Sequence, residues 1–391
     1  MHLALFTRDA LTAKHGSGAQ LIRLLDGSGI SYFHFYWWWG HGAISDRQPS
    51  FRLIAPDWMA RKGLFRFFSA LGMTWWKGTQ INTKKLLALR SARGLKCDVA
   101  YCLIGDEATA ARALSLVRAF GCPYIVHYMD LYEDELNPQT MPATAKLLED
   151  AAVVLVITEP LEREVAKFAP RDLRRVFIGQ DADVPQAKPP NPDLTLRVLL
   201  SGRVYESGLT LLEAALPQIR QCFHKIEFAY IGPEYEKIPP TLRPAVREIG
   251  FVPDEEYRQS LATFHLAFLM GPLDTDWLGK YSFPSRTSDY LMAGLPVLGC
   301  VGAGTATESV LMPLVPDAVR FTRTPQALVE ALGAFTASPE SWRKASAAAR
   351  AFATKHMALE TVRGQWTQAL QDAVRSHGVS DLRTSAGPGS T

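Results

Sequence analysis

One pattern constrains the fold of this chain more than any other: a short apolar run, then a loop, then an amphipathic helix. Up to residue 184, the apolar runs predict strands at 3–7, 30–38, 98–104, 123–128, 153–157 and 176–179. The pattern restarts with expected strands at 197–201, 226–231, 266–270 and 296–300. Apolar strands that alternate with helices are typical of crossover units, so we expect an α/β fold with parallel sheets.

A proline-rich stretch interrupts the pattern and divides the chain. Prolines 185, 189, 190 and 192 indicate a linker over 185–196. The 391 residues then form two tandem Rossmann-like, doubly wound domains, 1–184 and 197–356, of ordinary size. A final helix is expected over 357–377 and a flexible tail over 378–391. Ligands of such sheets bind beyond the carboxyl ends of the strands, which predicts a site in an interdomain cleft.

Composition excludes several other classes of protein. The net charge is only +3, which does not favour a nucleic-acid-binding protein. The five cysteines lack CxxC spacing, which indicates reduced thiols in a cytoplasmic protein. Arg8 and Asp9 end the first apolar run too soon for a signal peptide, and no run of about 18 apolar residues could span a bilayer. We recognise no metal-binding motif and expect no metal site.

Glycine-containing turns between expected strands and helices are the first candidates for a binding site. Gly16 and Gly18 would let the backbone approach a phosphate at a helix N-terminus, although a tight turn without a ligand explains them as well. Gly202 precedes Arg203, which could pair bidentately with a diphosphate or could be a surface side chain on a turn. Gly304 and Thr305, with Glu308 in the next turn, could hold a phosphate through backbone N–H groups.

The segment 280–297, KYSFPSRTSDYLMAGLPV, is the most specific candidate. Pro284 and Ser285 suit the start of a helix, and Gly294 suits its end. Asp289, one turn into the helix, could accept a hydrogen bond from a sugar hydroxyl or could be a solvated carboxylate. Near the end of an earlier strand, His127 and Asp130 could face the cleft, although a single histidine can also be structural.

These motifs resemble a GT-B glycosyltransferase, and in particular the retaining glycosyltransferases called family 4 or group 1. Residues 283–297 resemble the family's "PSK…EYLA-G-PV" segment, and 201–203 resemble its "vGR" turn. Residues 178–181 and 152–158 are similar to its "NGvD" and "ADAVIAVS" segments. In this fold the terminal helix crosses back onto the N-terminal domain.

Three positions depart from the family pattern. Asp289 stands where the family usually has Glu, and Tyr281 stands where the first Glu of its E-x7-E motif would fall. Ser207 matches the position of the lysine that follows the "GR" turn. Lys280 or Arg286 would have to replace that lysine at the diphosphate.

The resemblance implies transfer of a sugar from a nucleotide-sugar to an acceptor hydroxyl, with the nucleotide in the C-terminal domain. Asp289 would bind the ribose. Arg203, with Lys280 or Arg286, would stabilise the charge that grows on the departing diphosphate. Gly304 and Thr305 would donate N–H groups, and Gly16 and Gly18 would face the donor–acceptor junction. His127 or Asp130 would contact the sugar. Further nucleotide-sugar-binding residues are expected among Gly202, Ser285 and Glu308, and no cofactor is expected.

The balanced net charge hides one basic, aromatic block. Residues 58–97 hold nine Lys or Arg, six Phe or Trp, and no Asp or Glu. We expect Arg61, Lys62, Arg66, Phe68, Trp75 and Trp76 to contact an anionic membrane surface or a lipid-linked acceptor. Single-stranded nucleic acid could use the same residue types, and a domain helix with core aromatics is the plain alternative. The favoured protein is a peripheral enzyme on the inner face of the cell membrane, without a nucleic-acid partner.

Two other functions fit the same motifs. A nucleotide-sugar epimerase of this fold would act on its donor without an acceptor, and would need acids and bases in the cleft. A non-catalytic protein that binds sugar nucleotides would explain the departures at Tyr281 and Ser207.

Overall fold

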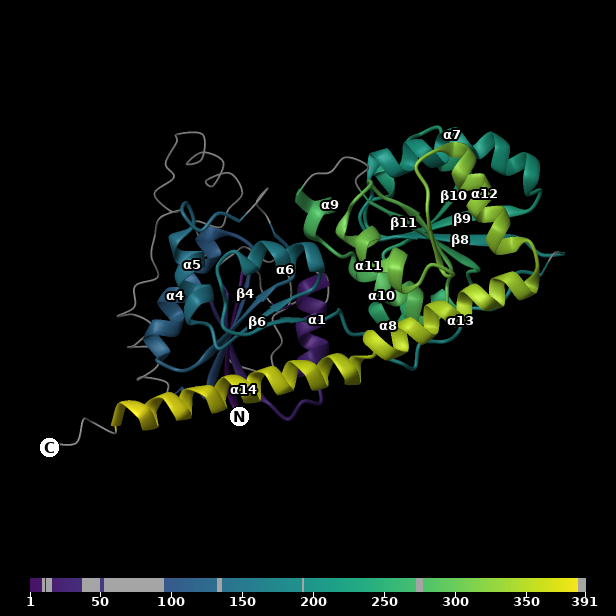
Figure 1. The fold of residues 1–391 in the computed structure, drawn as a ribbon. Coiled ribbons are helices and arrows are strands. Elements are labelled where there is room, and N and C mark those ends of the chain that lie inside the picture. The colour runs from purple at the N-terminus through teal and green to yellow at the C-terminus, as the bar shows by residue number, and fades with distance from the viewer. Residues whose placement is uncertain are drawn as a thin grey trace, which may run out of the picture. The chain divides into compact units, whose positions relative to one another are not determined.

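A computed structural model of the chain describes residues 1–8, 11, 16–36, 50–52, 95–131, 136–191, 193–271 and 277–385. For 16–17, 50–52, 277–278 and 377–385, only the backbone is described. The chain forms two compact units (Figure 1). The first consists of Met1–Ile157, Leu161–Val176 and Arg363–Thr391, and the second of Thr158–Pro160 and Phe177–Val362.

The first unit is built on a seven-stranded parallel sheet with the order β3-β2-β1-β4-β5-β6-β7. Its strands are β1 His2–Thr7, β2 Ser31–Tyr36, β3 Ser50–Arg52, β4 Val99–Ile104, β5 Tyr124–Tyr128, β6 Val153–Val156 and β7 Leu173–Arg175. Its helices include α1 Gly16–Leu25, α4 Glu107–Phe120, α5 Pro142–Asp150 and α6 Glu159–Ala166. Every residue of β5 and β6 is buried, as expected for central strands covered on both faces.

The second unit contains a six-stranded parallel sheet with the order β10-β9-β8-β11-β12-β13. Its strands are β8 Leu196–Ser201, β9 Ile226–Ile231, β10 Val246–Gly250, β11 Leu266–Met270, β12 Val297–Cys300 and β13 Val319–Phe321. Its helices are α7 Glu206–Cys222, α8 Asp254–Leu261, α9 Trp277–Tyr281, α10 Ser285–Met292, α11 Ala306–Leu314, α12 Pro325–Thr336 and α13 Pro339–His356, with short helices η3 Tyr235–Lys237 and η4 Arg243–Ala245. In Figure 1, α7 and α12 lie on one side of the strands and α8 and α10 on the other.

The last helix, α14 (Leu359–Ser385), begins in the second unit and belongs to the first from Arg363 onward. Trp366 is fully buried, and its ring centroid lies 5.8 Å from that of Tyr101 on β4. The Arg363 guanidinium donates to the Arg23 carbonyl at 2.8 Å. This helix therefore closes the core of a unit whose other elements lie far earlier in the chain.

The expected fold class is confirmed, and several boundaries differ. Residues 176–179 are not a strand: β7 precedes them, and Gly179 packs against Leu359 of α14. The strands β3, β7, β10 and β13 were not predicted. The first unit breaks after Ile157 and resumes over Leu161–Val176, whereas the N-terminal domain was expected to run to 184, and α14 continues to Ser385, into the stretch expected to be a flexible tail.

Candidate functional site

The turn after β8 in the second unit brings a glycine and an arginine to the carboxyl edge of the sheet. Gly202 has a left-handed backbone, with φ at 85°, which lets the chain turn sharply after Ser201. Its N–H donates to the Ile231 carbonyl at 3.1 Å, and the Tyr230 hydroxyl donates to its carbonyl at 2.8 Å. Arg203 is exposed next to this fixed turn. The Arg203 Cζ atom lies 5.6 Å from the centroid of the Tyr205 ring, so the turn presents an exposed cation beside an aromatic side chain.

A second turn, after β9, supports the first. Glu234 accepts a hydrogen bond from the Val204 N–H at 2.8 Å. Burial disfavours its charge, but hydrogen bonds from Lys237 and Val204 and the charge of Arg203 hold its pKa below the ordinary value. Glu234 is therefore an anion that fixes the residue next to Arg203.

The helix α10 places Arg286 against the same turn. A Cβ atom on Gly202 would lie 3.4 Å from the Arg286 Cγ, so the two residues are in close contact. Arg286 Nη1 donates to the Asp289 carboxylate at 3.2 Å, and the Arg286 Cζ atom lies 4.0 Å from the centroid of the Tyr257 ring. Burial opposes the charge of Arg286, but Tyr257, Asp289 and Tyr290 raise its pKa above the ordinary value. Its side chain remains about one-third exposed, at 34%.

A buried hydroxyl cluster lies under this arginine. The Ser201 hydroxyl is 3.0 Å from the Tyr257 hydroxyl and 2.8 Å from the Tyr290 hydroxyl. Burial raises the pKa of Tyr257 well above its ordinary value and that of Tyr290 to about 12, so both phenols are neutral at physiological pH. The cluster joins the end of β8 to α8 and α10.

Asp289, expected to bind a ribose, lies beside Arg286. Its side chain is only 2% exposed and forms an ion pair with that arginine. In this arrangement the carboxylate orients the arginine, and ribose binding by Asp289 stays a prediction. Tyr281, at the position of the family's first Glu, is also buried, and its carbonyl accepts a hydrogen bond from the Thr158 hydroxyl at 2.9 Å.

The Gly304 and Glu308 positions form a helix cap. The Gly304 N–H donates to the Glu308 carboxylate at 2.7 Å, and the Thr305 hydroxyl accepts from the Glu308 N–H at 3.4 Å. Glu308 thus accepts from the N–H of the residue before the N-cap Thr305, one position earlier than in a standard capping box. Arg323 also binds Glu308, at 2.5 Å. The Gly304 N–H, expected to bind a phosphate, has the Glu308 carboxylate as its partner in this structure, and its role in phosphate binding stays a prediction.

The remaining expected residues of the second unit lie near α10. Ser285 is the first residue of that helix, and Pro284 precedes it as the N-cap. Lys280 is exposed in α9, with its Nζ atom 5.8 Å from the Tyr281 ring centroid. Ser207 lies in the first turn of α7. No contact between Lys280 and Arg286 occurs in the described part of the chain.

In the first unit, His127 is a core residue. It lies within β5, is 2% exposed and shares a hydrogen bond with the Tyr101 hydroxyl. The structure thus encloses His127 in the core, and the contact with a sugar expected for it stays a prediction. Asp130 is half-buried just after β5. Gly16 and Gly18 form the first turn of α1, which begins earlier than expected, instead of a loop before it.

Several expectations concern residues outside the described ranges. The basic, aromatic residues Arg61, Lys62, Arg66, Phe68, Trp75 and Trp76 all lie there. So do Asp274 and Asp276, an Asp-x-Asp pair that the motif analysis overlooked when it expected no metal site. Within the described ranges, no group of three or more His, Cys, Asp or Glu could hold a metal ion. No described helix is long and apolar enough to cross a membrane.

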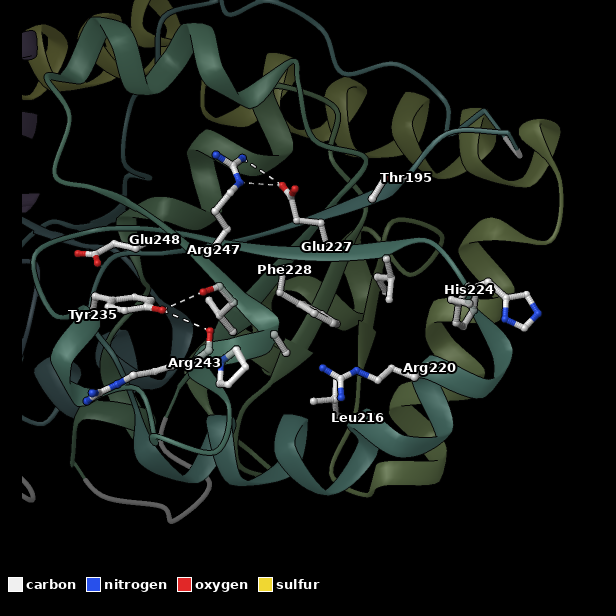
Figure 2. Close-up of a pocket in the computed structure, with 15 residues that line it drawn as sticks. Thr195, Leu216, Arg220, His224, Glu227, Phe228, Tyr235, Arg243, Arg247 and Glu248 are labelled. Atoms are coloured by element: carbon white, nitrogen blue, oxygen red, sulfur yellow. Dashed lines mark hydrogen bonds and ion pairs between the residues drawn. The ribbon is translucent and has the colours of Figure 1, made fainter.

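A hollow of about 800 Å³ lies at the opposite edge of the second sheet (Figure 2). It is lined by the end of α7, the η4 turn and the first residues of β9 and β10. Arg247 and Glu227 are joined by an ion pair at 3.0 Å, and Arg220 extends from α7. Because the candidate site lies at the carboxyl ends of the strands, this hollow is not its entrance.

Comparison with known proteins defines the fold. No family model and no curated protein sequence matches the chain. Among solved structures, HepE from Anabaena in complex with UDP has a TM-score of 0.68 at 14% identity, with 95% of this chain and 100% of that chain covered. Sucrose-phosphate synthase from Thermosynechococcus elongatus has a TM-score of 0.66 at 14% identity, with 96% and 99% covered. A glycosyltransferase from Rickettsia africae has a TM-score of 0.68 at 9% identity, with 95% and 98% covered.

These neighbours span nearly the whole chain and place it in one architectural class. The chain has the GT-B fold, with two Rossmann-like domains. HepE has also been solved with UDP-glucose.

The structure places Arg286 against Gly202, which precedes Arg203, and pairs it with Asp289. Sequence reasoning missed Tyr257 and Glu234, and it gave no role to the Ser201 hydroxyl. Gly232-Pro233-Glu234 follows an expected strand at the same sheet edge, so this turn could have been found by the same logic as Gly202. Nothing in the local sequence around Tyr257 indicates its contact with α10.

Proposed function

We propose that this chain transfers a sugar from a nucleotide-sugar, with UDP as the nucleotide, to an acceptor hydroxyl. The observation that carries the proposal is the pair of cations, Arg203 and Arg286, at the Gly202 turn. The GT-B neighbours solved with UDP or UDP-glucose add support for this class of ligand.

In this proposal both arginines bind the donor diphosphate, Arg286 from a fixed position and Arg203 from an exposed one. Arg286 is fixed by Asp289 and Tyr257, so its guanidinium would bind a diphosphate oxygen with little loss of side-chain freedom. Arg203 is exposed and would close on the same diphosphate. As the bond between the sugar and the diphosphate breaks, negative charge grows on the leaving group, and these preplaced cations would stabilise it.

We further propose a hexosyl donor and retention of configuration at the anomeric carbon. The UDP-glucose complex of HepE supports the hexose, and the resemblance to the retaining family supports the stereochemistry. In a front-side reaction the leaving diphosphate itself takes the proton of the acceptor hydroxyl. NMR of the anomeric proton in the first product tests this, because an inverted configuration would contradict it.

The acceptor that we propose is lipid-linked, and the basic, aromatic block of residues 58–97 supports this choice. Its nine cations would hold the protein at an anionic surface, on the cytoplasmic face of the membrane. Flotation with vesicles containing phosphatidylglycerol tests it. Replacement of Arg61, Lys62 and Arg66 by Glu should abolish flotation, whereas Lys344→Glu, an exposed position of α13, should not.

Calorimetric titration with UDP, GDP, ADP and dTDP tests nucleotide binding. We expect UDP to bind, and Arg203→Ala and Arg286→Ala each to weaken binding about tenfold or more, the usual value of a charged hydrogen bond. Arg220→Ala, in the hollow at the other edge, is the matched control and should leave the affinity unchanged. A protein that binds none of the four nucleotides would overturn the proposal.

Turnover then separates the enzyme classes. We expect UDP release from UDP-glucose that depends on added acceptor lipid. Conversion of the donor to another sugar nucleotide without an acceptor would instead identify an epimerase, and binding without turnover would identify a non-catalytic protein.

A further inference from the structure

We infer that Tyr257 is a positioning residue, which holds the Arg286 guanidinium in the orientation that binds the donor diphosphate. This inference rests on the proposed function, because it takes the diphosphate as the ligand of Arg286. Tyr257 lies in α8, whereas Arg286 lies in α10, so the inference adds to the site a residue from outside the 280–297 segment.

The first step is the contact between the arginine and the ring. The Arg286 Cζ atom lies 4.0 Å from the centroid of the Tyr257 ring, which is within the range of a cation–π interaction. A planar guanidinium stacks on such a face, whereas an ammonium has no plane to stack. The ring therefore contacts the central carbon of the guanidinium, and we infer that it holds the plane of the group as well as its charge.

The second step is that the ring itself does not move. Tyr257 is 1% exposed, and its hydroxyl lies 3.0 Å from that of Ser201, at the end of β8. Ser201 also bonds the Tyr290 hydroxyl, on the same helix as Arg286. The stacking surface is thus tied to both the strand that leads into the Gly202 turn and the helix that carries the arginine.

The third step is that the arginine keeps donors for a ligand. Asp289 accepts a hydrogen bond from Nη1, and within the described residues no other acceptor bonds the guanidinium. The side chain is 34% exposed, although Asp289 is only 2% exposed. The Asp289 carboxylate and the Tyr257 ring therefore fix the orientation of the guanidinium. Its remaining N–H groups, beside Gly202, can donate hydrogen bonds to a ligand.

A simple packing role for Tyr257 makes a different prediction from this one. If the ring only fills the core, its loss lowers stability and affects ligand binding regardless of the residue at 286. If the ring acts through Arg286, its effect on nucleotide affinity disappears once the arginine is gone. A double-mutant cycle separates the two.

The experiment measures the UDP dissociation constant of the full chain by calorimetry at fixed ionic strength. We expect Tyr257→Leu to weaken binding about tenfold, from loss of a partly desolvated cation–π contact. Arg286→Ala should weaken it further, and addition of Tyr257→Leu to Arg286→Ala should change it by less than about twofold. Tyr257→Phe, which keeps the ring, should bind UDP within about threefold of the parent.

Tyr124→Leu is the matched control, because it removes a buried tyrosine ring in the first unit, whose hydroxyl donates to the Leu147 carbonyl. It should leave UDP affinity unchanged. If Tyr257→Leu does not fold, Arg286→Lys gives a second test, since it keeps the charge and loses the plane; affinity equal to that of the parent would overturn the inference.

The outcomes distinguish the two levels of the proposal. A parent protein that binds no nucleotide removes the proposed function and this inference with it. A parent protein that binds UDP, with a Tyr257→Leu effect that persists in the Arg286→Ala background, leaves the function standing and overturns the positioning role alone.

Discussion

Two buried histidines should make the first unit sensitive to mild acid. His34 on β2 lies 2.7 Å from the Thr7 hydroxyl and is 1% exposed, and His127 on β5 shares a hydrogen bond with Tyr101. Burial lowers the pKa of each from 6.5 to about 3. Both rings are therefore neutral in the folded protein at a pH where the unfolded chain would protonate them.

The direction and size of the effect follow from this difference in proton binding. Below about pH 6.5 the unfolded state binds more protons than the folded state, so stability falls as the pH falls toward 3. Between pH 7 and pH 5 each histidine should cost about 2 kcal/mol, and the two together about 4 kcal/mol. That loss is a large part of the 5–15 kcal/mol that typically stabilises a domain.

Urea denaturation followed by circular dichroism at pH 7, 6 and 5 measures the loss. His34→Asn and His127→Asn keep a polar side chain and cannot titrate, so each should remove about 2 kcal/mol of the pH dependence even if it lowers stability at pH 7. His265 and His356, whose pKa values are also lowered by burial, remain in both variants and do not affect the comparison.

A His127→Asn protein that loses as much stability between pH 7 and pH 5 as the parent would refute the reasoning for that residue.

Three further predictions concern stability, measured by thermal or urea unfolding. Gly294→Ala should cost about 1–3 kcal/mol, because Gly294 has φ at 72° and a Cβ would lie 2.7 Å from the Ser346 hydroxyl oxygen. Gly333→Ala, in the open interior of α12, should be neutral or slightly stabilising; equal losses at the two glycines would contradict the strain argument. Trp366→Ala should cost about 3–5 kcal/mol, and a loss under about 1 kcal/mol would mean that α14 does not close the first core. Thr305→Ala should cost about 1 kcal/mol through loss of the α11 cap, and an unchanged midpoint would exclude that role.

The four strands that were not predicted from the sequence all lie at the edge of a sheet, and all contain arginine. β3, β7, β10 and β13 are the four edge strands of the two sheets, and each contains arginine. Charged side chains at an edge discourage pairing with other chains, but they also break the apolar run by which a central strand is recognised. The central strands, buried on both faces, were found because every position there favours an apolar residue.

Some features of the candidate site depend only on residues adjacent in sequence, and others depend on the packing of segments that are far apart in the chain. The Gly202 turn and the α10 helix start were predictable, because each depends on residues adjacent in sequence. The positioning of Arg286 by Tyr257 was not, because it depends on how α8 and α10 pack. The burial of His127 was not predictable, because a strand position gives no sign of which elements cover it; here the Tyr101 ring lies 5.9 Å from the His127 ring, and Trp366 packs in turn against Tyr101.

The position of α14 at the end of the sequence sets the order in which the two units can fold during synthesis. The hydrogen bond between Arg363 and Arg23 joins residues 340 positions apart, and Trp366 fills the core that β4 begins to form. A ribosome releases residues 1–176 long before it releases this helix. The second unit, which needs nothing beyond Val362, can therefore complete its fold first. Most of the first unit is synthesised earlier, but its core stays exposed until α14 emerges from the ribosome. Between the synthesis of residue 176 and that of α14, a chaperone would be needed to cover this apolar face.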